Sequence, residues 1–195
     1  MTDDTPIHIQ AVESLYDGWA SLKSVRFDYR RRDGGHDILD RLIFDSGDAA
    51  AVLPYDAARG VVLLARQFRL PPHLAGRSGF LLEACAGKLD GDDAETCARR
   101  EAEEELGYRL GPLERLFEAF MSPGALTEQV VFFLAPYSPA DRISDGGGHP
   151  HEGEDIEVVE TPFADALAMI ARGEIIDAKT IMLLQQLKLS GHLAG

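Results

Sequence analysis

The sequence predicts an α/β protein in which helices sandwich a mixed β-sheet, preceded by a small sub-domain of antiparallel β-strands. Two observations support this class. Short apolar runs of strand length alternate with helix-like segments over most of the chain. In the first fifty residues, by contrast, polar and apolar residues alternate around a glycine turn. We therefore expect residues 1–46 to form the sub-domain and residues 47–195 to form the main domain.

Composition limits the class of protein. With 195 residues, of which 45% are hydrophobic, the chain is long enough to bury one core. The formal net charge of −14 opposes binding to nucleic acid or to an anionic membrane, since both attract a basic surface. The longest apolar run, residues 130–135, is far shorter than the roughly 20 residues that span a bilayer, and no secretory leader is recognisable. We expect a cytoplasmic protein whose two cysteines, Cys85 and Cys97, lie in the core.

The N-terminal strands form a predicted hairpin. Residues 24–30 and 38–44 alternate in polarity and flank a turn around residues 33–35. Alternation indicates that one face of this sheet is covered, and a partner subunit is a candidate for covering it.

The remaining elements follow from apolar runs and their boundaries. The central strands are expected at residues 49–55, 61–68, 79–86, 113–121 and 129–136, with an edge strand at 154–160. Helices are expected from a cap at Thr161 and Pro162 to about residue 171, and over residues 178–189. Between them lies a long hydrophilic loop, residues 138–153, whose His149 and His151 are expected to be exposed rather than to bind metal.

An acidic helix over residues 93–106 is the strongest functional signal. Asp92 and Asp93 are good N-cap residues, and Gly107 is a typical helix stop. Helical spacing places Glu101, Glu104 and Glu105 on one face and points Glu103 away.

Arg100 can pair with Glu104 at the i,i+4 spacing, which leaves Glu101 and Glu105 for a hard cation such as Mg²⁺. The alternative is an ordinary solvated acidic helix. Two further basic residues, Arg66 and Arg69, end a predicted strand beside a loop, where they contact either phosphate or neighbouring acids.

The residues around this helix resemble the Nudix box, G-x5-E-x7-R-E-U-x-E-E-x-G-U, in which U is a bulky apolar residue. The matching positions, in order, are Gly87, Arg100, Glu101, Glu104, Glu105 and Gly107. The interval from Gly87 to Arg100 is one residue shorter than in the pattern, and Asp92 or Asp93 replaces the first glutamate.

Likeness to the nucleoside-diphosphate-sugar branch of the Nudix hydrolases extends over most of the chain. The segments that carry it are residues 66–69, 83–87, 121–128, 146–148, 154–158 and 177–180. Within that branch the chain looks most like the GDP-mannose pyrophosphatases, followed by the ADP-ribose pyrophosphatases. The resemblance implies an α/β/α Nudix sandwich and a homodimer that exchanges its N-terminal strands.

The resemblance also implies roles for individual residues. Mg²⁺, or Mn²⁺ as a substitute, would be held by Glu101, Glu105, Glu154 and the backbone carbonyl of Ala86, with Glu104 as a further ligand or a support. Glu154 is the first choice for activating the attacking water, and Glu128 is the second. The implied substrate-binding positions are Trp19, Arg41, Arg69, Ala86, Gly87, Lys88, Glu105, Glu128 and Lys179. For Trp19, a place in the core is an equal alternative.

The expected reaction is Mg²⁺-dependent hydrolysis of a small-molecule nucleotide sugar, GDP-mannose, to GMP and mannose 1-phosphate. Two alternatives remain at this stage. One is hydrolysis of ADP-ribose to AMP and ribose 5-phosphate by the same chemistry. The other is a nucleotide-binding regulatory module without turnover.

Overall fold

The computed structural model describes residues 5–149, 151 and 153–193, and the chain falls into two compact units. The first unit comprises Met1–Asp48 and Ala119–Gln129. The second comprises Ala49–Glu118 and Val130–Gly195. The expected division into a sub-domain of residues 1–46 and a main domain of residues 47–195 stays a prediction.

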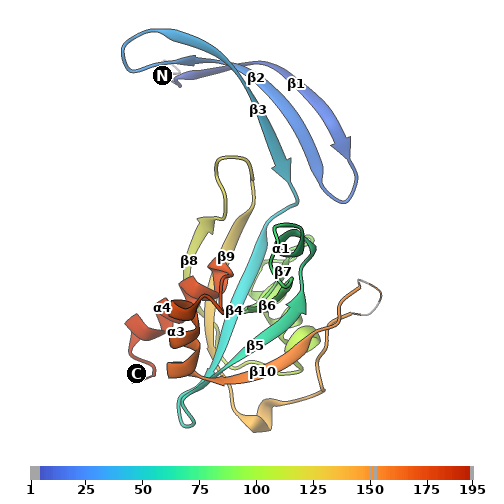
Figure 1. Cartoon of the computed structure of the whole chain (residues 1–195), viewed down its shortest axis with the longest axis vertical. Helices are drawn as coiled ribbons and strands as arrows, with labels where there is room; N and C mark the ends of the chain where they lie inside the picture. The colour runs from blue at the N-terminus through green and yellow to red at the C-terminus, as the bar shows by residue number, and fades with distance from the viewer. Residues whose placement is uncertain (1–4, 150, 152, 194–195) are drawn as a thin grey trace. The chain divides into compact units, whose positions relative to one another are not determined.

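The first unit contains a three-stranded antiparallel sheet in the order β1-β2-β3 (Figure 1). Its strands are β1 (Ile7–Asp17), β2 (Ser21–Arg30) and β3 (His36–Asp45). The predicted hairpin is confirmed as the β2–β3 pair, whose register runs from Ser21 opposite Asp45 to Arg30 opposite His36. Gly34, with φ of 85°, supplies the left-handed backbone of the tight connection.

This three-stranded sheet exposes large apolar side chains. Ile7, Ile9, Val12, Leu15, Ile38 and Leu42 are all between 45% and 59% exposed. The expected covering of one face is therefore not supplied by the described part of this chain. Exposed apolar area of this kind is typical of surfaces that bind another protein.

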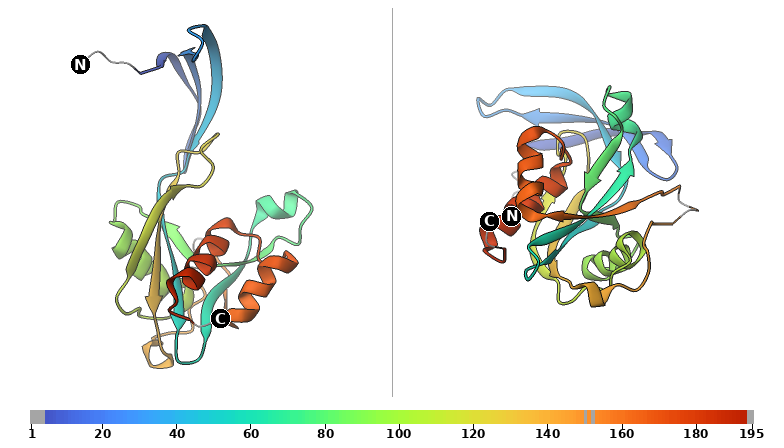
Figure 2. Two further views of the ribbon diagram at one scale, coloured as in Figure 1. Left: turned by 90° about the vertical axis from the view of Figure 1, so that its left-hand side faces the viewer. Right: turned by 60° about the horizontal axis from the view of Figure 1, so that its bottom comes forward.

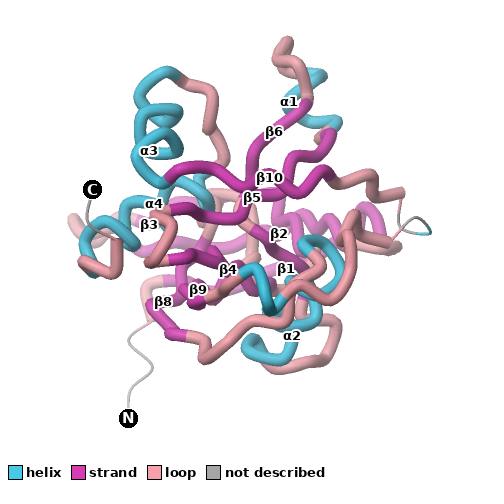
Figure 3. The backbone as a smooth tube through the Cα atoms, turned by 90° about the horizontal axis from the view of Figure 1, so that it is seen from below, coloured by secondary structure: helices cyan, strands magenta, loops and turns pink. Residues whose placement is uncertain are grey.

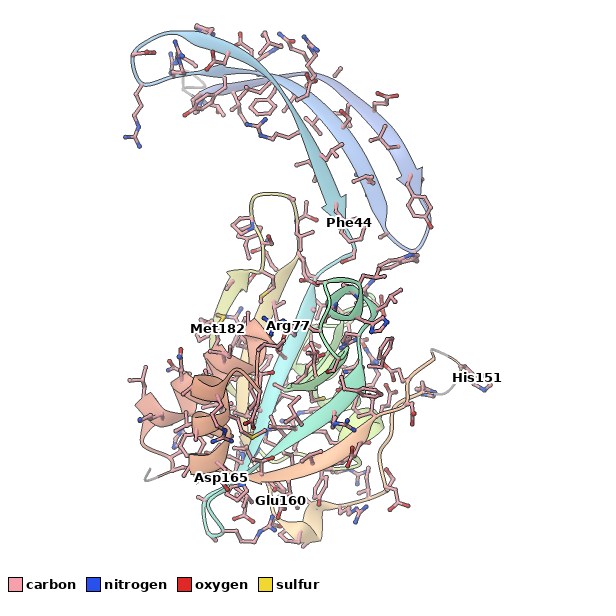
Figure 4. All side chains as sticks on the ribbon, in the orientation of Figure 1. Phe44, Arg77, His151, Glu160, Asp165 and Met182 are labelled. Atoms are coloured by element: carbon pink, nitrogen blue, oxygen red, sulfur yellow. The ribbon has the colours of Figure 1, made fainter. Side chains whose placement is uncertain are left out.

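The end of β3 is hydrogen-bonded to residues 119–129, the later segment of the chain that belongs to the first unit. The N–H of Phe44, labelled in Figure 4, donates to the carbonyl of Ala125 at 2.8 Å, and the N–H of Thr127 donates to the carbonyl of Phe44 at 3.1 Å. Asp48 accepts the N–H of Gln129 at 2.9 Å. Residues 119–129 are thus part of the N-terminal unit through backbone bonds.

The second unit contains the predicted mixed sheet. Its strands are ordered β10-β5-β4-β9-β8, while β6 pairs with β5 and β7 pairs with β4. β4 and β9 are parallel, whereas β5 is antiparallel to β4 and β10. The bounds are β4 (Ala49–Asp56), β5 (Val61–Phe68), β6 (Phe80–Glu83), β7 (Cys85–Lys88), β8 (Glu114–Phe120), β9 (Gln129–Pro136) and β10 (Glu157–Pro162). In the left view of Figure 2, the neighbouring strands β8 and β9 run side by side.

Two expectations about these strands were wrong in detail. The apolar segment 79–86 forms two strands, because its pairing partner changes at Ala84. The part before Ala84, β6, pairs with β5, and the part after it, β7, pairs with β4. The edge strand begins at Glu157 instead of Glu154, which leaves Glu154 and Asp155 in the preceding loop. Its position at the edge of the sheet is confirmed.

Helices lie on both sides of this sheet. Figure 3 shows α3 (Phe163–Arg172) and α4 (Ala178–Ser190) on one side and α2 (Ala94–Glu101) on the other. A short helix that the sequence analysis did not predict, α1 (Leu70–Leu74), has prolines in its first turn. The expected cap at Thr161 is wrong, because Thr161 belongs to β10 and the helix begins after Pro162 without a side-chain cap bond.

One core cluster lies between α2 and the sheet and includes the buried residues Val52, Leu63, Cys97 and Leu106. On α4, the side chains of Leu183, Leu184 and Leu187 are buried as well. Cys85 and Cys97 are both free and fully buried, which confirms their expected place in the core. In the described part of the chain, no helix is both long and apolar enough to span a membrane.

Candidate active site

The acidic helix begins and ends where the sequence indicates. Asp93 is the N-cap, and its Oδ1 accepts the N–H groups of Glu95 and Thr96, both at 3.0 Å. Gly107 ends the helix with a φ of 76°. Only the form of the last turn differs from expectation, because residues 102–106 make a π-helix in place of continued α-helix.

The backbone carbonyls of this π-turn accept hydrogen bonds from the glycine loop, which is the segment around residues 146–148. The carbonyl of Glu105 accepts the N–H of Gly147 at 2.9 Å, and the carbonyl of Glu104 accepts the N–H of Gly148 at 3.1 Å. A Cβ at Gly146 would lie 2.5 Å from the Glu105 carbonyl oxygen, so the close approach requires glycine. The helix end and the loop are therefore one structural feature.

A polar pocket of about 250 Å³ opens beside the helix. It brings together most of the predicted site residues of the second unit. Its lining consists of Arg69, Ala86, Gly87, Lys88, Asp90, Arg100, Glu101, Glu105 and Glu154. Gly87 lets the helix approach the strand, because a Cβ there would overlap the carboxylate of Glu101.

Glu105 is the most unusual acid in this pocket. It is only 2% exposed, and its Oε2 has no hydrogen-bond partner among the described residues. Burial raises its pKa to about 8, although a hydrogen bond from Cys85 acts in the opposite direction. Burial likewise raises the pKa of Glu101. A buried carboxylate oxygen without a partner is costly unless a cation or proton satisfies it.

Arg100 pairs with more acids than expected. Its predicted contact with Glu104 is confirmed at 3.1 Å, but the same nitrogen lies 2.8 Å from Glu101, so the expectation that Glu101 is left unpaired was wrong. Asp92 also contacts Arg100, at 3.5 Å. Among the described residues, no group of three or more acids, histidines or cysteines is already arranged as a metal site. The carboxylates share a pocket, but Arg100 holds one of them.

The glycine loop carries Glu154 into the pocket. Oε2 of Glu154 accepts the N–H of His149 at 2.8 Å, and a Cβ at Gly148 would overlap this oxygen. The His149 ring lies 3.8 Å from Glu104 and is exposed, as is His151 at the outer part of the loop (Figure 4). The expected exposure of both histidines is confirmed.

A second cavity of about 270 Å³ shares Arg69 and Glu154 with the first. It is also lined by Gln67, Phe68, Phe80, Gly153 and Asp155. Gln67 is only 6% exposed and brings a polar side chain to this cavity. These residues were not predicted as site residues from the sequence, although a glutamine within an apolar strand is a usable signal.

Arg66 and Arg69, at the end of β5, both make ion pairs. The alternative that they contact neighbouring acids is therefore confirmed. Arg66 contacts Glu157 at 2.9 Å and lies 4.7 Å above the Phe80 ring. Arg69 forms a bidentate pair with Glu83, at 2.9 and 3.1 Å. Unlike Arg66, Arg69 also lines both cavities, so the ion pair does not remove it from the site.

The other predicted substrate residues lie outside this pocket's lining. Lys179 contacts Asp177 at 2.7 Å and lies 3.9 Å from Glu83. Trp19, Arg41 and Glu128 belong to the first unit. Trp19 is 73% exposed and meets Phe44 edge-on, which rules out the core alternative for it. The roles of all these residues stay predictions.

Known proteins with similar sequences match nearly the whole chain. The family model described as NUDIX domain matches residues 45–184, and the one described as GDP-mannose pyrophosphatase NudK N-terminal domain matches residues 6–42. A GDP-mannose pyrophosphatase of Pectobacterium atrosepticum is 48% identical and covers 97% of this chain and 98% of its own. One from Klebsiella pneumoniae is 45% identical, with coverage of 97% and 95%. One from Yersinia pestis is 50% identical, with coverage of 89% and 87%.

A solved structure also resembles the chain. The crystal structure of an ADP compounds hydrolase aligns with a TM-score of 0.74 at 20% identity, covering 97% of this chain and 98% of its own. At that identity the likeness supports the fold alone.

Proposed function

The chain belongs to the NUDIX family, and from this premise we propose that it hydrolyses the pyrophosphate of GDP-mannose to GMP and mannose 1-phosphate. The observation that carries the proposal is the full-length similarity to GDP-mannose pyrophosphatases, which includes the N-terminal region. The pocket beside α2 supports it, because acidic residues, two arginines and Gly87 of β7 line one cavity.

The donor set of this pocket fits a divalent cation, on which NUDIX proteins typically depend. Glu101, Glu105, Glu154 and the carbonyl of Ala86 offer the oxygen ligands that Mg²⁺ or Mn²⁺ prefers. Such a cation would also satisfy Oε2 of Glu105, which has no hydrogen-bond partner among the described residues. Glu104, held by Arg100, is a further ligand or a support. When bound, the metal neutralises charge that would repel the nucleophile from the pyrophosphate.

The protein residues supply orientation and a base. Glu154 accepts the proton of the attacking water, and Glu128 is the second choice for this role. Arg69 neutralises a phosphoryl oxygen from the wall that both cavities share. The backbone of Gly87 and Lys88, with Glu105, contacts the substrate near the metal, and Lys179 adds a second cation.

The proposal extends to a cytoplasmic homodimer in which the N-terminal sheet meets a second copy. The exposed apolar side chains of β1 and β3 support this assembly, since they find no cover within the described chain. Trp19 and Arg41 are the residues that this arrangement would bring to the nucleotide.

A panel assay tests the proposed reaction. The rates of hydrolysis of GDP-mannose, ADP-ribose, other nucleotide sugars and a dinucleoside polyphosphate are compared, each with Mg²⁺ and with chelator. We expect Mg²⁺-dependent turnover with GDP-mannose preferred. A preference for ADP-ribose would overturn the substrate, and no turnover with any compound would instead favour a regulatory module.

A further inference from the structure

Glu83 is hydrogen-bonded to Arg69, the arginine that lines both cavities. We propose that its buried carboxylate is a positioning residue that holds the guanidinium of Arg69 in place for the substrate. The inference rests on the proposed function, in which Arg69 contacts a phosphoryl oxygen. It adds a residue outside the lining of both cavities.

The contact between Glu83 and Arg69 has the geometry of an orienting pair. Nε and Nη2 of Arg69 donate to the two oxygens of Glu83, at 2.9 and 3.1 Å. The side chain of Glu83 is only 3% exposed, whereas that of Arg69 is 41% exposed. A two-point contact of this kind fixes the plane of the guanidinium and leaves its third nitrogen, Nη1, without a bond to Glu83, in a side chain that lines both cavities.

The strand end that carries Glu83 is itself held by the start of α4. The N–H of the next residue, Ala84, donates to Oγ1 of Thr180 at 2.7 Å. Thr180 is fully buried and also donates to Asp177, the N-cap of α4. Lys179 follows this cap and lies 3.9 Å from Glu83. The start of α4 thus anchors the strand end from which Glu83 reaches Arg69.

Arg69 has competing partners nearby. Burial alone would lower its pKa, but the bonds to Glu83 and the charge of Glu105 raise it above the usual value. Glu105 and Glu154 line the same pocket as Arg69. Without the charge of Glu83, the guanidinium would turn toward these carboxylates and neutralise groups that the proposed metal needs.

A merely structural role for the pair makes a different prediction. A buried ion pair that only joined β6 to the start of α1 would affect unfolding and leave substrate binding unchanged. Since buried pairs are weak evidence of net stabilisation, the two roles must be separated by function.

The test is a double-mutant cycle with Glu83→Gln, Arg69→Gln and the double variant. It measures kcat and KM for GDP-mannose with Mg²⁺, and the Kd for GDP-mannose by calorimetry with chelator. We expect Glu83→Gln to raise KM and Kd about tenfold and to alter kcat less. Added to Arg69→Gln, it should change KM by less than about twofold, because the two residues act as one unit.

A matched control is Glu157→Gln, which removes the partner of the neighbouring Arg66 and should leave KM unchanged. Arg69→Lys provides a second variant should Glu83→Gln fail to fold, since lysine keeps the charge but cannot make the two-point contact. It should bind GDP-mannose about tenfold more weakly. Independent, additive effects of the two glutamine variants, unchanged KM in Glu83→Gln, or wild-type affinity in Arg69→Lys would overturn the inference.

Failure of the proposed function has a separate signature. It would appear in the wild-type protein, as absent turnover and absent binding of GDP-mannose, and would remove both proposals. Failure of the positioning role alone would appear only in the variants, with the wild-type reaction intact.

Discussion

The buried acid of the pocket, Glu105, makes the free protein sensitive to pH. Its pKa is raised by burial to about 8, from an ordinary value of 4.5. The folded state therefore retains a proton that the unfolded chain releases. The stabilising effect of this proton is complete below about pH 4.5 and is lost as pH rises through about 8.

Replacing Glu105 with glutamine tests this account in two ways. Glutamine resembles the protonated acid, so Glu105→Gln should abolish turnover while the metal-free fold remains intact. With chelator, the variant and the wild type should have similar Tm at about pH 4, below the unfolded pKa of Glu105, and the variant should have the higher Tm at pH 9. Thermal unfolding and the turnover assay provide the readouts. An active Glu105→Gln protein would contradict the metal assignment.

Sequence spacing could place the acids of the box but not their partners. Glu101 and Glu105 are four residues apart and do line one pocket, as a helical face predicts. The second contact of Arg100, to the adjacent Glu101, has no counterpart in helical spacing rules. Glu83 becomes recognisable as a partner of Arg69 only when β5 and β6 are paired, so it was not predicted as a site residue.

At the scale of elements, the glycine loop and the end of the acidic helix are joined by backbone hydrogen bonds. Gly148 has a φ of 77°, and a Cβ there would overlap Glu154. Gly148→Ala should therefore displace Glu154 and lower kcat at least tenfold more than the control Gly173→Ala. The control has a similar φ of 70° but open space around it, so it isolates the cost of the backbone conformation.

Circular dichroism and thermal unfolding would show that both alanine variants remain folded. Equal kcat in the two variants would mean that contact with Glu154 does not matter. Deleting residues 146–148 should similarly impair turnover more than stability, and the reverse outcome would make the loop merely structural.

The sequence could predict most of these elements but not the joint between them. Apolar runs located the strands of the second unit and the helices α3 and α4, whereas β1 was not predicted as a separate strand. The π-turn escaped prediction because its residues are good helix formers, and its form is accompanied by backbone bonds to a loop some forty residues later. Tertiary contacts of this kind leave no local signal.

At the scale of the whole molecule, the exposed apolar side chains of the N-terminal sheet predict an assembly. Val12 is 59% exposed on β1 and Leu42 is 55% exposed on β3. The double variant Val12→Lys, Leu42→Lys should shift the protein from dimer to monomer, because unpaired charges oppose burial. Light scattering coupled to size-exclusion chromatography measures the mass directly.

The matched control is Leu189→Lys, since Leu189 is 80% exposed on α4 in the second unit. It should leave the dimer intact. A wild-type protein that runs as a monomer would contradict the proposed assembly, as would a lysine double variant that remains dimeric.

The architecture of the second unit could be read from the sequence because alternating elements constrain a mixed sheet. The sequence could not, however, show which segments of the chain make up the first unit. Residues 119–129 look like a plain connection between two strands, yet the backbone of Phe44 bonds to Ala125 and Thr127. Those bonds depend on distant backbone geometry and on no residue pattern.

The inclusion of residues 119–129 in the first unit also limits where the chain can be divided into fragments. A fragment ending at Asp48 would lack the segment to which its last strand is bonded, and a fragment beginning at Ala49 would carry that segment without its partner. A chimaera that exchanges N-terminal regions between relatives must therefore move residues 119–129 together with the first 48. A single crossover point would separate Phe44 from the residues to which its backbone is hydrogen-bonded.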